Sequence, residues 1–159
     1  MVEKFSFIQI GTIKTPHLEA DKTPIQPTFA VDCRGEVLVF PEFAEGLRDI
    51  EGFSHIFLIY AFHKVATSKL IVKPFLEDIE HGVFATRAPC RPNPIGISVV
   101  RLLGKRENVL EISGADMLDG TPLLDIKPYT ALFDKIEGTK NGWQDGLDPK
   151  KSMKIGSRR

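Results

Sequence analysis

Two arginines lie four positions apart in the segment 82–96, which reads Gly-Val-Phe-Ala-Thr-Arg-Ala-Pro-Cys-Arg-Pro-Asn-Pro-Ile-Gly. Each of its three prolines fixes its own φ and pushes the preceding residue toward extended conformations, so the segment predicts a stiff loop. Arginine binds carboxylates and phosphates in a two-pronged way, and rigid loops often carry binding groups. We therefore expect Arg87 and Arg91 to bind an anionic ligand. The alternative is a proline-rich turn with surface arginines.

Aspartates recur in the segment 114–129, which has the form of a hairpin with its turn at 119–122. Turn geometry accounts for Asp119 and Gly120 without any further role. Asp116 and Asp125 instead lie within apolar, strand-like sequence, where an unpaired carboxylate is costly. We expect both to have partners, and the arginines of the segment 82–96 are candidates.

The histidines and cysteines of the chain do not follow metal-binding spacings. His55 and His63 bracket one apolar run, and eight residues of extended chain separate them by roughly 26 Å, too far to share a metal ion. We expect no metal site. A nucleophilic pair of Cys90 and His81 is an alternative chemistry, and the cysteines are expected to be reduced thiols.

The chain has 159 residues with 21 basic and 21 acidic side chains, which fits a single domain and excludes a protein that grips nucleic acid with its whole surface. Local patches are basic, however, because the stretches 86–106 and 149–159 each hold five basic residues and no acid. We expect a basic tail at 139–159 with no second domain, and a frayed terminus is the alternative for it. Without a membrane-length apolar run or a secretion signal, the default expectation is a cytoplasmic protein.

Short strand-like runs dominate the sequence and predict a mainly β fold, a single-domain barrel over residues 1–138 with one or two short helices. A sandwich is the alternative. No glycine-rich strand-to-helix turn is present, so neither a Rossmann site nor a P-loop is expected. A short helix is expected at 41–50, and the segment 64–81 is expected as an excursion with an edge strand at 70–72 and a helical turn at 74–79. The expected strands are 5–13, 36–40, 53–63 (covered on both faces), 82–85, 95–103, 109–113 and 123–126.

Three segments, 53–63, 82–98 and 116–129, resemble the TrmO (YaeB, VirR-like) family in order and spacing, and the resemblance covers roughly residues 8–134. It implies an S-adenosylmethionine-dependent methyltransferase with a β-barrel core that is not a Rossmann fold. The substrate that it implies is tRNA, methylated on N6 of threonylcarbamoyladenosine beside the anticodon. It also implies a homodimer. The alternative is a cofactor-binding regulator or RNA-binding module that has the same barrel and no catalysis.

The resemblance also implies which residues form the cofactor site, and the chemistry of methyl transfer suggests the role of each. Arg87 would hold the cofactor's carboxylate, while Arg91 and Asn93 would contact the substrate. Asp119 is the first candidate for the catalytic base, and His63 is the second. Ile25 stands where other members often carry arginine, which removes one anion contact. The full set implied for the cofactor is Pro24, Ile25, Gln26, His63, Lys64, Arg87, the backbone of Ile97, Leu118, Asp119, Gly120, Thr121 and Pro122.

Overall fold

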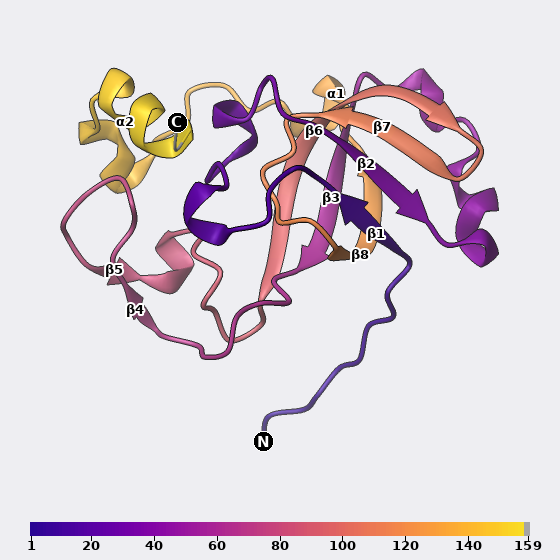
Figure 1. Cartoon of the computed structure of the whole chain (residues 1–159). Coiled ribbons are helices and arrows are strands. Elements are labelled where there is room, and N and C mark those ends of the chain that lie inside the picture. The colour runs from indigo at the N-terminus through magenta and orange to yellow at the C-terminus, as the bar shows by residue number, and fades with distance from the viewer. Residues whose placement is uncertain (158–159) are drawn as a thin grey trace.

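A computed structural model of the chain describes residues 1–157, and its body is a closed barrel of six antiparallel strands in the order β1-β2-β7-β6-β3-β8 (Figure 1). This confirms the prediction of a mainly β barrel with few short helices. The barrel strands are β1 (Gly11–Lys14), β2 (Arg34–Val39), β3 (His55–Ala61), β6 (Ile95–Arg106), β7 (Val109–Ser113) and β8 (Thr121–Pro128).

The core follows from the two-residue period of the strands. In β3, Ile56, Leu58 and Tyr60 point inward and are buried, while the alternate side chains are half-buried. The prediction that both faces of this strand would be covered is therefore only partly right. Each buried aliphatic side chain contributes about 1.5–3 kcal/mol to folding. The fully enclosed members of the core are Ile13, Val37, Ile56, Leu58, Leu110, Ile112, Ala115 and Leu123.

The first barrel strand is shorter than expected. It begins at Gly11 instead of residue 5, because β2 and β8 provide backbone partners only from Ile10 onward. The preceding residues extend away from the barrel (Figure 1). Phe5 and Phe7 in this segment are exposed. Apolar residue types alone therefore predicted strand where the neighbouring strands had already ended.

The segment 114–129 is not a hairpin. Among the residues that the structure describes, β7 pairs with β2 and β6, whereas β8 pairs with β1 and β3. Residues 114–120 therefore cross from one part of the barrel to another. Gly120 has a φ of +76°, a conformation that side chains disfavour, and it turns the chain into β8.

Several 3₁₀ helices replace expected elements. Asp49, with a φ of +67°, separates η3 (Pro41–Leu47) from η4 (Ile50–Gly52), where one helix was predicted. In the excursion, β4 (Ile71–Val72) pairs with β5 (His81–Gly82), residues 74–79 form turns, and η5 (Val83–Ala85) replaces a strand. Two further 3₁₀ helices, η1 (Ala20–Lys22) and η2 (Pro27–Phe29), precede β2.

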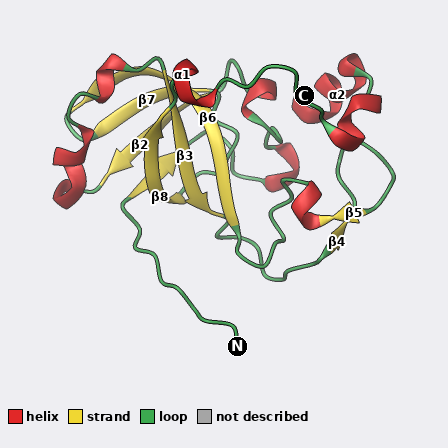
Figure 2. Ribbon diagram, turned by 180° about the vertical axis from the view of Figure 1, so that it is seen from behind, coloured by secondary structure: helices red, strands yellow, loops and turns green. Residues whose placement is uncertain are grey.

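The C-terminal residues fold back beside the barrel as α1 (Ala131–Asp134), η6 (Gly142–Gly146) and α2 (Pro149–Ser157) (Figure 2). The backbone N–H of Ile25 donates to the carbonyl of Gly156 over 3.0 Å. Gly156 also lies against the ring of Phe29, which would be 2.4 Å from a Cβ at this position. The alternative of a frayed tail is therefore wrong for the described part, and Arg158 and Arg159 lie outside it. No helix within residues 1–157 is long and apolar enough to span a bilayer.

Candidate functional site

A cavity of about 920 Å³ lies where β3 ends and β6 begins. Its volume is in the range of small-molecule sites. Five connecting segments surround it: the residues around η2, the excursion, the loop 86–94, the connection 114–120 and the C-terminal residues. The predicted site residues that line it are Pro24, Ile25, Gln26, His63, Lys64, Arg87, Arg91, Ile97, Leu118 and Thr121.

Arg91 forms hydrogen bonds with backbone carbonyls of its own proline-rich loop. Its Nη1 donates to the carbonyls of Thr86 (2.9 Å) and Ala88 (3.2 Å), and its guanidinium lies 5.9 Å from the ring centre of Phe84. This side chain is therefore already engaged, which argues against its expected role as a free substrate contact. Asn93 lies outside the cavity, where its carbonyl accepts the N–H of Ile95 over 2.7 Å.

Arg87 connects two of the segments around the cavity. Its Nη1 donates to Oε1 of Gln26 over 2.7 Å, which ties the loop 86–94 to the residues before η2. The side chain is otherwise exposed, so its remaining donors face solvent and the cavity. A planar guanidinium with spare donors suits a ligand carboxylate.

Asp116 is the carboxylate that lines the cavity, at the end of a hydrogen-bonded chain. Oγ of Ser98 donates to Oδ1 of Asp116 over 2.6 Å and lies 3.0 Å from Oη of Tyr60. A serine hydroxyl has one proton, so with Asp116 ionised the order of donation is Tyr60 to Ser98 to Asp116. Burial raises the pKa of Asp116 to about 7, although the Ser98 hydrogen bond and the charge of Arg87 act in the opposite direction.

The position of the Tyr60 ring depends on the absence of a side chain at residue 96. A Cβ at Gly96 would come within 2.2 Å of the Tyr60 ring, so only glycine leaves room for the ring beside β6. Burial, followed by the negative charge of Asp116, raises the pKa of the Tyr60 phenol well above its usual range. The phenol is therefore a permanent hydrogen-bond donor or acceptor at physiological pH.

His63 is exposed at the cavity beside Lys64. Desolvation lowers the pKa of His63, the charge of Lys64 lowers it further, and a backbone hydrogen bond at Ala61 opposes them. The imidazole is therefore neutral at pH 7. A neutral imidazole can accept a proton, so His63 stays a candidate.

The structure places Asp119 outside the cavity, so the geometry gives no support to its expected role as first candidate for the base. Its Oδ1 accepts the backbone N–H of Thr15 over 3.1 Å, and its own N–H donates to the carbonyl of His17 over 2.8 Å. Asp119 thus fixes the connection 114–120 to the end of β1. Gly120 and Pro122 lie outside the cavity with it.

Sequence reasoning missed Asp116 as a site residue, although its place in apolar sequence already indicated a partner. The expected partner was an arginine. Ser98 is the direct partner, and Arg87 acts only through its charge. Apolar neighbours in the sequence indicate that an aspartate needs a partner, but they do not say where it lies in the fold. They could not decide whether Asp116 or Asp119 belongs to the site.

The nucleophilic pair of Cys90 and His81 does not form. Nε2 of His81 pairs with Oε1 of Glu77, and its ring stacks on Trp143 with centroids 5.0 Å apart. Tyr129 lies against His55 and Phe57, whereas Phe62 and Trp143 line the cavity. Among residues 1–157, no three His, Cys, Asp or Glu side chains gather in a group suited to a metal ion.

Comparison with known proteins adds the following findings. The family model of the tRNA-methyltransferase O N-terminal domain matches residues 12–135. A probable S-adenosyl-L-methionine-binding protein of Pyrococcus abyssi is 58% identical over 84% of this chain and 73% of its own length. The tRNA (adenine(37)-N6)-methyltransferase of Escherichia coli K12 is 36% identical over 85% of this chain and 62% of its own length.

The fold is similar to a crystal structure of TrmO from Pseudomonas aeruginosa. The two superpose with a TM-score of 0.77 and 40% sequence identity, over 94% of this chain and 65% of that one. The chain therefore spans somewhat less than two thirds of both this structure and the Escherichia coli protein.

Proposed function

The chain belongs to the tRNA-methyltransferase O family of S-adenosylmethionine-dependent methyltransferases, and we propose that it methylates N6 of threonylcarbamoyladenosine beside the anticodon of tRNA. The family match and the relatives' names support methyl transfer to a tRNA adenine. The threonylcarbamoyl group is the finer part of the proposal. The homodimer and the cytoplasmic location implied by the family stay predictions, to be tested by light scattering and by fractionation.

The residues of the cavity fit the cofactor. S-adenosylmethionine combines an adenosine, a sulfonium cation and an amino-acid carboxylate, and a 920 Å³ cavity has room for it. Arg87 provides a two-pronged partner for the carboxylate. Asp116 provides a negative charge to a cation, and the apolar walls formed by Phe62 and Leu118 suit the flat base.

Asp116 is the observation that carries the catalytic part of the proposal. When bound, the cofactor supplies an electrophilic methyl group on sulfur. The acceptor is a urea-type N–H that is poorly nucleophilic until its proton leaves. A carboxylate with a pKa of about 7 is half ionised near neutral pH and can accept that proton as the N–C bond forms and the S–C bond breaks.

Ser98 and Tyr60 act on Asp116 rather than on the substrate. Through its hydrogen bond, Ser98 fixes the direction in which Oδ1 of Asp116 points. Tyr60, fixed over Gly96, holds Ser98 in turn. Catalysis by positioning depends on such fixed geometry, because the acceptor atom must lie in line behind the methyl carbon.

A cofactor-binding module without catalysis is the second candidate. Ile25 favours it, because this apolar side chain lines the cavity where other members often carry arginine. Its backbone N–H is also engaged, by the carbonyl of Gly156. The two functions differ in one measurable property, which is transfer of the methyl group.

The test is mass spectrometry of digested tRNA after incubation with the cofactor. The tRNA comes from a strain that lacks its own enzyme for this modification. We expect a mass gain of one methyl group on threonylcarbamoyladenosine, and a loss of about 10²–10⁴ in kcat for Asp116→Asn. Asp125→Asn is the matched control, since Asp125 pairs with Lys127 outside this cavity. Cofactor binding without any transfer by the wild type would overturn the proposal in favour of the second candidate.

A further inference from the structure

Residues 136–157 follow the family domain, which ends at residue 135, and part of them forms one wall of the cavity. Trp143, Leu147 and Met153 line it from this side. The family domain therefore does not enclose the site of this chain alone.

This wall is held at both ends. Nε1 of Trp143 donates to the carbonyl of Ala85 over 2.8 Å, and its ring stacks on His81, which is itself paired with Glu77. At the other end, Gly156 lies against Phe29 so closely that a Cβ would meet the ring. The segment is thus fixed to the excursion through η6 and to η2 through α2.

The same helix that closes the cavity carries basic side chains. Lys150, Lys151 and Lys154 are exposed, and no acid occurs between Pro149 and Ser157. Lys150 and Lys154 are one helical turn apart, so they stand on one face about 6 Å from each other along the axis. Asp78 lies near Lys151, but its main partner is Lys73, at 2.7 Å.

The positive charge continues across the cavity to its other walls. Lys64, Lys73 and Arg87 line the cavity from the opposite segments. A ligand that combines a flat base with several phosphates matches this arrangement, since the base fits a concave, partly aromatic cavity and the phosphates fit exposed lysines. A small anion would use only one of these cationic side chains and would not need the cavity.

We propose that α2 is the RNA-docking surface of this chain, on which Lys150, Lys151 and Lys154 bind the phosphates that flank the nucleotide in the cavity. The inference rests on the proposed function, because it takes a single-stranded tRNA loop as the ligand. Sequence-independent phosphate contacts would position the loop, and the cavity would recognise the base.

The experiment compares tRNA binding by the wild type and by the variant K150Q/K151Q/K154Q at several salt concentrations, without turnover. We expect roughly tenfold weaker binding near 0.1 M salt, and a salt dependence whose slope falls by about 2–3. Cofactor affinity should stay unchanged, because the three lysines do not line the cavity. The variant K150R/K151R/K154R should restore binding.

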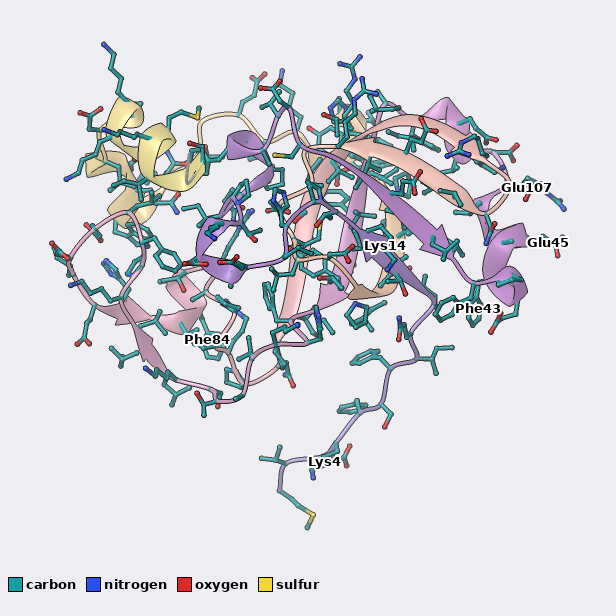
Figure 3. All side chains as sticks on the ribbon, in the orientation of Figure 1. Lys4, Lys14, Phe43, Glu45, Phe84 and Glu107 are labelled. Atoms are coloured by element: carbon teal, nitrogen blue, oxygen red, sulfur yellow. The ribbon has the colours of Figure 1, made fainter. Side chains whose placement is uncertain are left out.

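R48Q/K105Q/R106Q is the matched control, because it removes the same number of positive charges. Arg48 follows η3, and Lys105 and Arg106 end β6 beside Glu107, at the opposite end of the molecule from α2 (Figure 3). Equal tRNA affinity in both triple variants would overturn the docking surface. A wild type that binds tRNA through these lysines but transfers no methyl group would leave the surface standing and refute only the proposed function.

Discussion

The ring of Tyr60 occupies the space that a side chain at residue 96 would need, so that Gly96 and Tyr60 determine each other's place in the barrel. The pair lies between the core and the cavity, where the Tyr60 hydroxyl is 3.0 Å from Oγ of Ser98. The packing of the barrel and the geometry of the carboxylate at the site are thereby coupled.

Gly96→Ala should destabilise the protein and impair methyl transfer together. The added methyl group must displace the Tyr60 ring, and overpacking of this kind costs about 1–3 kcal/mol. Thermal or denaturant unfolding measures the first effect, and initial transfer rates measure the second. Gly104→Ala, on the same strand with open space at its Cα, should leave both nearly unchanged. Equal effects of the two substitutions would contradict the coupling.

Ser98→Ala should move the pH dependence of transfer. The hydrogen bond from Ser98 lowers the pKa of Asp116, so its removal raises that pKa further above 7. The acid limb of the kcat profile should therefore shift to higher pH, with less activity at pH 7 and partial recovery at pH 8–9. Ser113→Ala, which removes a hydroxyl bonded to the carbonyl of Val31, is the control. An unshifted profile would show that Asp116 is not the titrating group.

Cofactor affinity should increase with pH between about 6 and 8. Only ionised Asp116 attracts the sulfonium, and its pKa is about 7. The neutral thioether product, S-adenosylhomocysteine, should bind with little dependence on pH in the same range. Calorimetric titration of both ligands measures the contrast, and Asp116→Asn should abolish it.

The same pKa makes the unliganded protein less stable as pH rises. The carboxyl of Asp116 titrates near 4 when unfolded and near 7 when folded, so its contribution is complete below pH 4 and is lost as pH passes 7. Asp116→Asn should remove a difference on the order of a few kcal/mol between pH 5 and pH 8. Denaturant unfolding at the two pH values checks the sign, and a wild type that is more stable at pH 8 would contradict it.

Arg87 and Arg91 should respond differently to substitution despite their shared loop. Arg87→Ala removes donors available to a ligand carboxylate, and a hydrogen bond to a charged group is worth about 1.5–3 kcal/mol, so cofactor affinity should fall roughly tenfold to a hundredfold. Arg91→Ala instead frees the carbonyls of Thr86 and Ala88, and should loosen the loop. Cofactor titration and proteolysis of the loop distinguish the two. Matching losses of affinity would contradict these roles.

The barrel was predictable because each of these strands has its own local sequence pattern. β2, β3, β6 and β7 all fall where apolar residues with glycine or proline boundaries predict them. The hairpin predicted at 119–122 is absent, because which strands pair depends on barrel closure rather than on the turn residues. The same crossing decides that Asp116 lies in the cavity and that Asp119 holds the end of β1.

The C-terminal segment illustrates a second limit. Its sequence has few apolar residues, and what orders it is a set of distant contacts, Trp143 with Ala85 and His81, and Gly156 with Phe29. Such contacts have no local signature. The loop at 82–96 was predicted to carry binding groups, and several of its residues line the cavity. The hydrogen bonds of Arg91 to carbonyls of its own loop depend on the folded path of the loop.

Hydrogen-bond donation runs from Tyr60 through Ser98 to Asp116, and protonation of Asp116 can reverse this direction. With Asp116 ionised, Ser98 gives its only proton to the carboxylate and must receive one from Tyr60. When Asp116 gains a proton, it becomes a donor, and each hydroxyl along the chain is free to turn the other way. The phenol of Tyr60, enclosed in the barrel, thus senses the charge of a carboxylate that it does not touch, and its NMR resonances offer a remote readout of each protonation event at the site.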